Sequence, residues 1–247
     1  MTAPLEGKTA PITGASSGIG AAAARSLSAA GAHVLLAARR KDRLDALAKE
    51  LPNAEVLVMD VTDAAGMQAA IGKREIDIVL ANAGMARGVA PIQEGGMDEW
   101  SEVIDTNVKG VLHAVRCVLP GMIERGHGDV VLLGSVAGRN VYPGGTVYCM
   151  TKYAVNALYH GLRLDAAGKG VRFTSVDPGM VETEFSDVRF DGDKERAATV
   201  YANWKPLQPS DVADAILYAV SRPPHVNIGE IVLWSTQQAT VRDVHKG

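Results

Sequence analysis

The sequence predicts an α/β fold in which a doubly wound sheet of seven parallel strands is flanked by helices on both faces. Two observations lead to this class. Short apolar runs alternate with helical stretches, and most of these runs are apolar at every position rather than at every second one. Strands that are apolar on both faces and separated by helices are typical of a parallel sheet buried between two helical layers. Right-handed crossovers leave few topologies, with the doubly wound one first.

Seven runs supply the expected strands, at 9–13, 32–38, 54–60, 76–81, 129–135, 171–177 and 230–234. The helical stretches between them include 19–30, 41–50, 98–125 and 147–168. One local rule is broken, because Pro11 falls inside the first strand. That strand should be central, and proline cannot donate to a strand ladder. A shortened pairing at Pro11 is the account that we offer.

A polar segment at about 184–206 is the one shift in composition along the chain, most pronounced over 186–206. It lies between the sixth strand and the following helix, so we interpret it as an insertion over the active site. No repeat or linker divides the remainder. The sequence therefore predicts a single domain over 1–247, with a cofactor-binding half at about 1–130 and a catalytic half at about 131–247.

Composition and charge exclude several classes of function. The 247 residues are 47% hydrophobic with a net charge of −3, which predicts no surface for nucleic acid or for a membrane. Cys117 and Cys149 have neither metal-ligand spacing nor a disulfide pattern. The N-terminus does not resemble a signal peptide, and apolar runs stop well short of the ~20 residues that a membrane span needs. We expect a cytoplasmic protein without a metal site.

A glycine-rich turn, T-G-A-S-S-G-I-G at 13–20, joins the first strand to the first helix. Gly14 permits the turn, Gly18 lets backbone N–H groups approach a pyrophosphate, and Gly20 allows close packing of helix on strand. The helix N-terminus itself favours an anion. At the first strand-to-helix junction of an alternating chain, this pattern predicts a dinucleotide site. The predicted site also includes Ser16, Ser17 and Ile19.

Basic residues follow the second strand, which ends A-A-R-R-K-D-R. A cofactor whose ribose carries a free 2′-hydroxyl is usually held by an acid at this point. Arg39 and Arg40 stand here instead, and arginine suits a 2′-phosphate. We therefore predict NADP(H) as cofactor and favour Arg39 as phosphate ligand, with Ser16 adding a hydroxyl. The alternative is a solvated basic helix start, which Lys41 and Arg43 also fit.

The third and fourth strands end in polar or small residues that face the same predicted cleft. Asp60, followed by Val61, is expected near the adenine. The fourth strand ends A-N-A-G, where Gly84 allows the backbone close to the cofactor and Asn82 offers hydrogen bonds. The predicted site includes Ala83 between them. Taken singly, Asp60 and Asn82 also fit helix caps or turn residues.

A serine, a tyrosine and a lysine form the candidate catalytic group. Ser135 ends the fifth strand, and Tyr148 and Lys152 lie four residues apart in the following helical stretch, so they share one face. A phenol with a pKa near ~10 is a poor acid or base at neutral pH unless a cation stabilises the phenolate. Lys152 is placed to do so, and Ser135 can donate a hydrogen bond to the same substrate oxygen. An ordinary amphipathic helix would also accommodate the pair alone.

Together these motifs resemble the short-chain dehydrogenase/reductase family over nearly the whole chain. The matching residues are T-G-A-S-S-G-I-G, D-V at 60–61, A-N-A-G at 81–84, Asn107 in D-T-N-V-K-G, Ser135, the Tyr148–Lys152 pair, and P-G at 178–179 followed by Thr183. Ser135 precedes Tyr148 by thirteen positions, the usual family interval. Ala81 replaces the first asparagine of the family's N-N-A-G. The resemblance implies a single-domain Rossmann fold and an NADP-dependent oxidoreductase.

The resemblance also implies a role for each matching residue. Tyr148 would be the general acid in reduction and the base in oxidation, while Lys152 would lower its pKa and bind the nicotinamide ribose. Ser135 would polarise the substrate carbonyl, and Asn107 would hold a water in a proton relay. The residues expected to wrap the nicotinamide end are Pro178, Gly179, Val181 and Thr183.

A finer resemblance points to the substrate. Segments 182–193, 119–128 and 223–228 are similar to the branch that oxidises 3-hydroxy acids and β-hydroxy amino acids, or reduces small acidic aldehydes. That branch uses NADP and forms homotetramers. A carboxylate or sulfonate substrate needs a cation, for which Arg189 is the first candidate. Behind it come Arg139 and Lys205, although a loop arginine also fits a surface position.

Two other functions remain open. A reductase of neutral or bicyclic ketones would use the same scaffold and chemistry, since fold does not determine substrate. A regulator that binds NADP(H) without turnover would belong to a different class. The homotetramer has its own support in apolar residues that extend beyond one face of 98–125 and 147–168. These residues are Val111, Leu112, Val115, Val118, Leu158 and Leu162. Packing of each of them on the sheet is the alternative.

Overall fold

Seven parallel strands form one sheet in a computed structural model that describes residues 3–246. The strand order is β3-β2-β1-β4-β5-β6-β7, which confirms the doubly wound topology. The order reverses between β1 and β4, and ligands of such sheets bind beyond the carboxyl ends of the strands at this point. The strands are β1 (Thr9–Thr13), β2 (His33–Ala38), β3 (Ala54–Val58), β4 (Ile78–Ala81), β5 (Gly128–Leu133), β6 (Val171–Pro178) and β7 (Glu230–Leu233).

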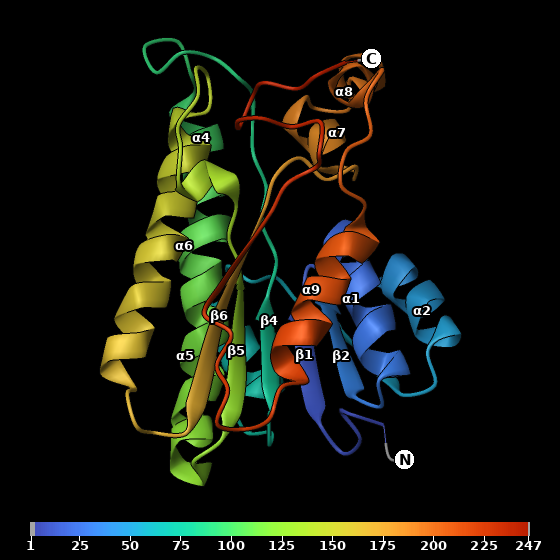
Figure 1. The fold of residues 1–247 in the computed structure, drawn as a ribbon, viewed down its shortest axis with the longest axis vertical. Coiled ribbons are helices and arrows are strands. Elements are labelled where there is room, and N and C mark those ends of the chain that lie inside the picture. The colour runs from blue at the N-terminus through green and yellow to red at the C-terminus, as the bar shows by residue number, and fades with distance from the viewer. Residues whose placement is uncertain (1–2, 247) are drawn as a thin grey trace.

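Helices cover both faces of the sheet (Figure 1). One face carries α1 (Gly18–Ala29), α2 (Lys41–Glu50) and α9 (Pro209–Val220), and their buried side chains form one apolar cluster with the sheet. The other carries α3 (Ala64–Ile71), α5 (Gly110–Arg125) and α6 (Thr146–Asp165), with a second apolar cluster. Burial on both faces explains why the strand runs are apolar throughout.

Two short helices occupy the predicted insertion, α7 (Phe185–Arg189) and α8 (Lys194–Tyr201). They lie beyond the carboxyl ends of the strands, and the chain after β7 runs to the same end of the molecule (Figure 1). We call residues 183–191, which contain α7, the lid. The lid and the C-terminal segment therefore both lie over the switch point of the sheet.

The expected helix over 98–125 is divided in the structure. α4 (Met97–Ile104) passes into a π-helical turn, Asp105–Lys109, before α5 begins. The buried side chain of Asn107 lies in this turn and bonds Met85 twice, accepting from its N–H and donating to its carbonyl, both at 2.8 Å. Single π-turns in helices occur frequently at functional sites. Sequence periodicity does not distinguish such a turn from continuous α-helix.

Pro11 lies in a central strand, as the sequence indicated. The register of β1 with β2 runs through five residue pairs, whereas its register with β4 is the single pair Ile12↔Leu80. A ladder shortened on one side is what a missing N–H predicts. The expectation of a shortened pairing at Pro11 is therefore confirmed.

Two further features concern membranes and metals. Within residues 3–246, no helix is both long and apolar enough to cross a bilayer. The same residues contain no group of three or more His, Cys, Asp or Glu side chains arranged to hold a metal ion.

Candidate active site

Ser135, Tyr148 and Lys152 come together at the carboxyl end of the sheet. β5 ends at Leu133, two residues earlier than expected, and Ser135 caps a short 3₁₀ turn by accepting from the N–H of Ala137 at 3.1 Å. Tyr148 lies in the first turn of α6 and Lys152 one turn later. All three line one cleft of about 1020 Å³. The structure thus brings the predicted catalytic group together.

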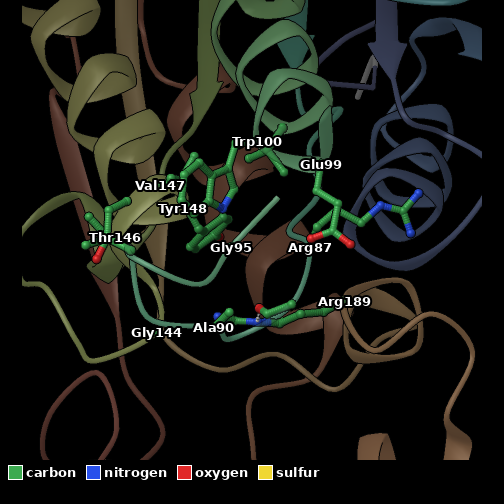
Figure 2. Close-up of a pocket in the computed structure, with 13 residues that line it drawn as sticks. Arg87, Ala90, Gly95, Glu99, Trp100, Gly144, Thr146, Val147, Tyr148 and Arg189 are labelled. Carbon is green, nitrogen blue, oxygen red and sulfur yellow. Dashed lines mark hydrogen bonds between the residues drawn. The ribbon is translucent and has the colours of Figure 1, made fainter. Parts of the chain in front are cut away.

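The lid closes one side of this cleft, which we call the catalytic cleft. The ring of Phe185 packs edge-on against Tyr148, with ring centroids 5.4 Å apart. A smaller hollow of about 430 Å³ also adjoins Tyr148, and there Arg189 reaches from the lid to the carbonyl of Gly88 at 3.0 Å (Figure 2). Tyr148 is therefore enclosed by the lid as well as by its own helix.

Lys152 is buried and held by the backbone of the preceding strand. Its Nζ donates to the carbonyl of Leu133 at 2.8 Å and lies 5.9 Å from the centroid of the Tyr148 ring. Burial lowers the pKa of Lys152 from its ordinary value of 10.5 to about 8, against the opposing charge of Asp177. Burial thus disfavours the charged ammonium of Lys152 relative to the neutral amine, compared with a lysine in water.

The pKa of Tyr148 shifts in the direction opposite to our expectation. Burial, with Tyr142 nearby, raises the pKa of the phenol, and the Ser135 hydrogen bond and the charge of Arg189 only partly offset it. Lys152 does not offset the rise, because its ammonium donates to the Leu133 carbonyl instead of the phenol. Tyr148 is therefore a protonated phenol at neutral pH, in the form that can donate a proton.

Asn107 is linked by hydrogen bonds to the first turns of α6. Its Nδ2 donates to the hydroxyl of Thr151 at 3.1 Å, and that hydroxyl donates to the carbonyl of Tyr148 at 2.7 Å. A Cβ on Gly84 would stand 3.3 Å from Asn107 Oδ1 and 3.7 Å from Lys152 Nζ. Glycine at this position therefore keeps space open beside both groups.

A second cleft, of about 1230 Å³, opens over the switch point and meets the catalytic cleft. We call it the cofactor cleft. Gly20 lies outside the lining, where its missing side chain lets α1 pack closely on the carbonyl of Gly14. Three further residues predicted to bind the cofactor line the catalytic cleft rather than the cofactor cleft, namely Pro178, Gly179 and Val181. The predicted residues that line the cofactor cleft are Gly14, Ser16, Ser17, Gly18, Ile19, Arg39, Arg40, Asp60, Val61, Asn82, Ala83, Gly84 and Thr183.

The residues of the cofactor cleft fit a dinucleotide. Gly14 has a φ of +68°, and a Cβ there would stand 2.8 Å from Asn82 Nδ2, so the tight turn requires glycine. Ser17 precedes α1 as its N-cap but forms no side-chain cap bond, and its hydroxyl accepts from Arg40 instead. The first N–H groups of α1 therefore face the cleft as an anion site.

Arg40, rather than Arg39, gathers the polar groups expected around a 2′-phosphate. Its Nη2 donates to the hydroxyls of Ser16 and Ser17 at 2.9 and 2.7 Å. The side chain of Arg39 is 69% exposed and lies 3.7 Å from Asp60. Our preference for Arg39 is thus not supported by the geometry, because two adjacent residues at a strand end point in different directions.

Asp60 and Asn82 take the turn contacts that their residue types favour. Asp60 Oδ1 accepts from the N–H and the hydroxyl of Thr62, both at 2.9 Å. Asn82 Nδ2 donates to the carbonyl of Thr13 at 2.7 Å and so ties the end of β4 to the end of β1. Both residues shape the floor of the cofactor cleft.

Of the three basic candidates for a substrate anion, the structure brings only Arg189 to the catalytic cleft. Its Nη1 donates to the hydroxyl of Tyr142 at 2.9 Å. Arg139 instead donates to the buried Asp177 at 2.8 and 2.6 Å and to Glu230. Lys205 is exposed on the chain between α8 and α9. Arg139 is therefore a structural ion-pair partner.

Among the residues of the catalytic cleft that sequence reasoning missed are Tyr142 and Arg242. Tyr142 carries Arg189 over its ring at 5.4 Å from the centroid, and Arg242 over the same ring at 5.3 Å. Both arginines and Tyr142 line the cleft. Arg242 belongs to the C-terminal segment, whose Val241 is buried against Tyr142. No local pattern places a chain end against a loop a hundred residues earlier.

A doubly wound sheet with a glycine-rich turn at its switch point and a serine–tyrosine–lysine group beside it defines a dinucleotide-dependent oxidoreductase. The chain belongs to the short-chain dehydrogenase family. A model described as short chain dehydrogenase matches residues 8–194. The predicted family, fold class and enzyme class are thereby confirmed.

Several relatives are similar over almost the full length. Sulfoacetaldehyde reductase 2 of Chromohalobacter salexigens is 42% identical over 92% of this chain and 94% of its own. The NADP-dependent 3-hydroxy acid dehydrogenase of Schizosaccharomyces pombe is 40% identical over 98% of both chains. The closed form of a serine dehydrogenase complexed with NADP⁺ is 37% identical, covers 97% of this chain and 100% of its own, and has a TM-score of 0.92.

Proposed function

We propose that the protein is an NADP(H)-dependent oxidoreductase acting on a small 3-hydroxy acid, β-hydroxy amino acid or acidic aldehyde. The observation that carries this proposal is the pair of guanidinium groups on Tyr142, in the cleft that holds Ser135 and Tyr148. The names of the relatives support the cofactor and the substrate class. Arg40 with Ser16 and Ser17 would hold the 2′-phosphate, and α1 the pyrophosphate.

The bound nicotinamide would supply or accept the hydride. Tyr148 donates a proton to the developing alkoxide in reduction and takes it back in oxidation. Ser135 donates a second hydrogen bond to the same oxygen, which stabilises the charge as it forms. Lys152 holds a positive charge beneath the reacting groups, and Asn107 positions the first turn of α6 through Thr151.

The acidic group of the substrate would bind between Arg189 and Arg242. A carboxylate or sulfonate in a partly buried cleft needs charge-assisted hydrogen bonds, and arginine provides two parallel donors. Arg189 belongs to the lid and Arg242 to the C-terminal segment, so an acidic substrate would bind to both covering segments at once. Its carbonyl or hydroxyl carbon would then lie toward Ser135 and Tyr148.

Initial rates with NADP and NAD against a substrate panel test this proposal. The panel contains L-serine, allo-threonine, 3-hydroxypropionate, 3-hydroxyisobutyrate, sulfoacetaldehyde and neutral ketones. We expect activity on the acidic members with NADP, and a KM increase of about 10- to 100-fold for them in Arg189→Met and Arg242→Met. Arg222→Met, on the chain after α9, is the matched control. An unchanged KM for the acidic substrates in both cleft variants would contradict the proposal that Arg189 and Arg242 bind the acidic group.

The same panel separates the two alternatives. The apolar part of the cleft wall, which includes Val181, Phe185 and Phe190, would suit a neutral ketone. Turnover of a neutral ketone far above that of any acid would keep the cofactor and the mechanism and discard the acidic substrate. Binding of NADP(H) with no turnover of any member would favour the non-catalytic regulator.

We also propose a homotetramer. Most of the apolar residues noted on the two long helices are buried against the sheet, but Leu112 on α5 and Met150, Tyr153 and Leu164 on α6 are 43–80% exposed. β7 ends the sheet, and Trp234 beside it is also exposed. Light scattering should therefore give four times the 26.0 kDa of one chain. Leu112→Glu should lower that mass, whereas Val58→Glu, on the opposite edge strand, should not.

A further inference from the structure

A carboxylate of the lid, that of Glu184, is bound by the arginines that follow β2. Glu184, the residue before α7, accepts from Arg40 Nη1 at 3.0 Å and from Arg43 Nη1 at 2.6 and 2.7 Å. These partners are 144 and 141 positions away in the chain. The hydrogen bond from Arg43, followed by that from Arg40, lowers the pKa of Glu184 below its ordinary value, so the carboxylate is charged at neutral pH.

The donors that Glu184 uses belong to the side chain proposed for the 2′-phosphate. Arg40 bonds Glu184 through Nη1, Ser16 through Nε at 3.1 Å and both serines through Nη2. Its guanidinium has five N–H donors in a fixed plane, and all three of its nitrogens are engaged. A 2′-phosphate can therefore bind Arg40 fully only by taking donors from these oxygens, and two anions on one guanidinium repel each other.

We propose that Glu184 is an internal competitor of the cofactor's 2′-phosphate on Arg40, so that phosphate binding releases the lid from Arg40. This inference rests on the proposed NADP(H) function. Serine hydroxyls can turn to donate to a phosphate, whereas a carboxylate cannot. Glu184 is thus the group that must leave. A cofactor without the 2′-phosphate would leave the Glu184 bridge in place.

Displacement of Glu184 by the phosphate affects the catalytic cleft because Glu184 directly precedes α7, whose residues Phe185 and Arg189 line that cleft. α7 has five residues, starting with Phe185 against Tyr148 and ending with Arg189 on Tyr142. The other end of the lid is held separately, since Arg87 donates to Asp191 at 2.9 Å. Losing the bond between Glu184 and Arg40 therefore loosens only the end of the lid that adjoins the cofactor cleft.

Cofactor binding to Glu184→Gln tests the competition without relying on turnover. We expect the Kd for NADP⁺, measured by calorimetry at constant ionic strength, to fall by about 3- to 10-fold, the effect of one or two exposed ion pairs. The Kd for NAD⁺ should change by less than about 2-fold, because NAD⁺ has no 2′-phosphate. Glu182→Gln is the matched control, since it removes a charge from the same loop, where the Glu182 carboxylate accepts from Gln208.

Arg40→Gln separates failure of this inference from failure of the proposed function. The variant should weaken NADP⁺ binding by about 10- to 100-fold and leave NAD⁺ binding nearly unchanged. If it leaves NADP⁺ binding unchanged, the phosphate site is wrongly placed and the inference fails with it. If Arg40→Gln weakens NADP⁺ binding but Glu184→Gln leaves it unchanged or weaker, or if Glu182→Gln tightens it equally, the phosphate site stands and only the competition is rejected.

Discussion

Replacing Tyr148 by phenylalanine should lower kcat by about 10³-fold or more while the Kd for NADP⁺ stays within about threefold of wild type. The substitution removes only the hydroxyl, and the ring can keep its edge contact with Phe185. The other two phenols that line the cleft are already hydrogen-bonded, Tyr142 to Arg189, and Tyr201 to Ser186 and the Val181 carbonyl. Steady-state rates and calorimetry on the same preparation measure the two quantities.

The pH dependence gives a second readout of the same residue. Burial raises the pKa of Tyr148, so its phenolate forms only as the pH becomes alkaline. The wild-type rate of alcohol oxidation should therefore increase with pH, and this increase should be absent in Tyr148→Phe. Tyr153→Phe, on the exposed side of the same helix, is the control and should behave as wild type. Substantial turnover in Tyr148→Phe would contradict the proton-transfer role.

The parts of the site that sequence predicts are those that depend on chain-local geometry. Four-residue spacing on a helix brings Tyr148 and Lys152 onto one face whatever surrounds them, and parallel topology brings the ends of β1, β4 and β5 to one edge. The glycine turn depends on φ values that only its own residues determine, as at Gly14. These features could be stated before the structure because no distant contact decides them.

The remainder depends on contacts between distant segments. Arg40 and Arg39 are equivalent in sequence, and only the approach of Ser16, Ser17 and Glu184 selects Arg40. Arg242 reaches the cleft because Val241 packs beneath Tyr142. The expected direction of the Tyr148 pKa shift was wrong for the same reason, since helical spacing shows that Lys152 is near but not that its ammonium donates to the Leu133 carbonyl.

Burial of the charged Lys152 side chain has a cost in stability. Burial lowers its pKa from 10.5 to about 8, which corresponds to about 3 kcal/mol of differential interaction. The folded state therefore binds fewer protons than the unfolded state between these values, and stability from this group rises with pH there. Below pH 8 the full cost of the buried ammonium is present. Functional groups commonly carry such a cost.

Lys152→Met should accordingly lower turnover by about 10²-fold or more and yet make the protein more stable at pH 7. Methionine relieves the cost of the buried charge but leaves the Leu133 carbonyl without its donor, a loss of about 1–2 kcal/mol. The net gain is then about 1–2 kcal/mol, or about 2–8 °C in Tm for a chain of this length. Thermal unfolding at one protein concentration measures it.

The pH dependence of that gain identifies its origin. The gain should shrink as the pH rises from about 8 toward 10.5, because wild-type Lys152 then loses its proton in the folded state. Lys109→Met is the control, since Lys109 is 61% exposed and paired with Asp105 on the surface, and its Tm difference should be small over this range. A Lys152→Met protein less stable than wild type at pH 7, or a gain independent of pH, would show that the buried ammonium is not costly. In the first of these cases Lys152 would contribute to stability as well as to catalysis.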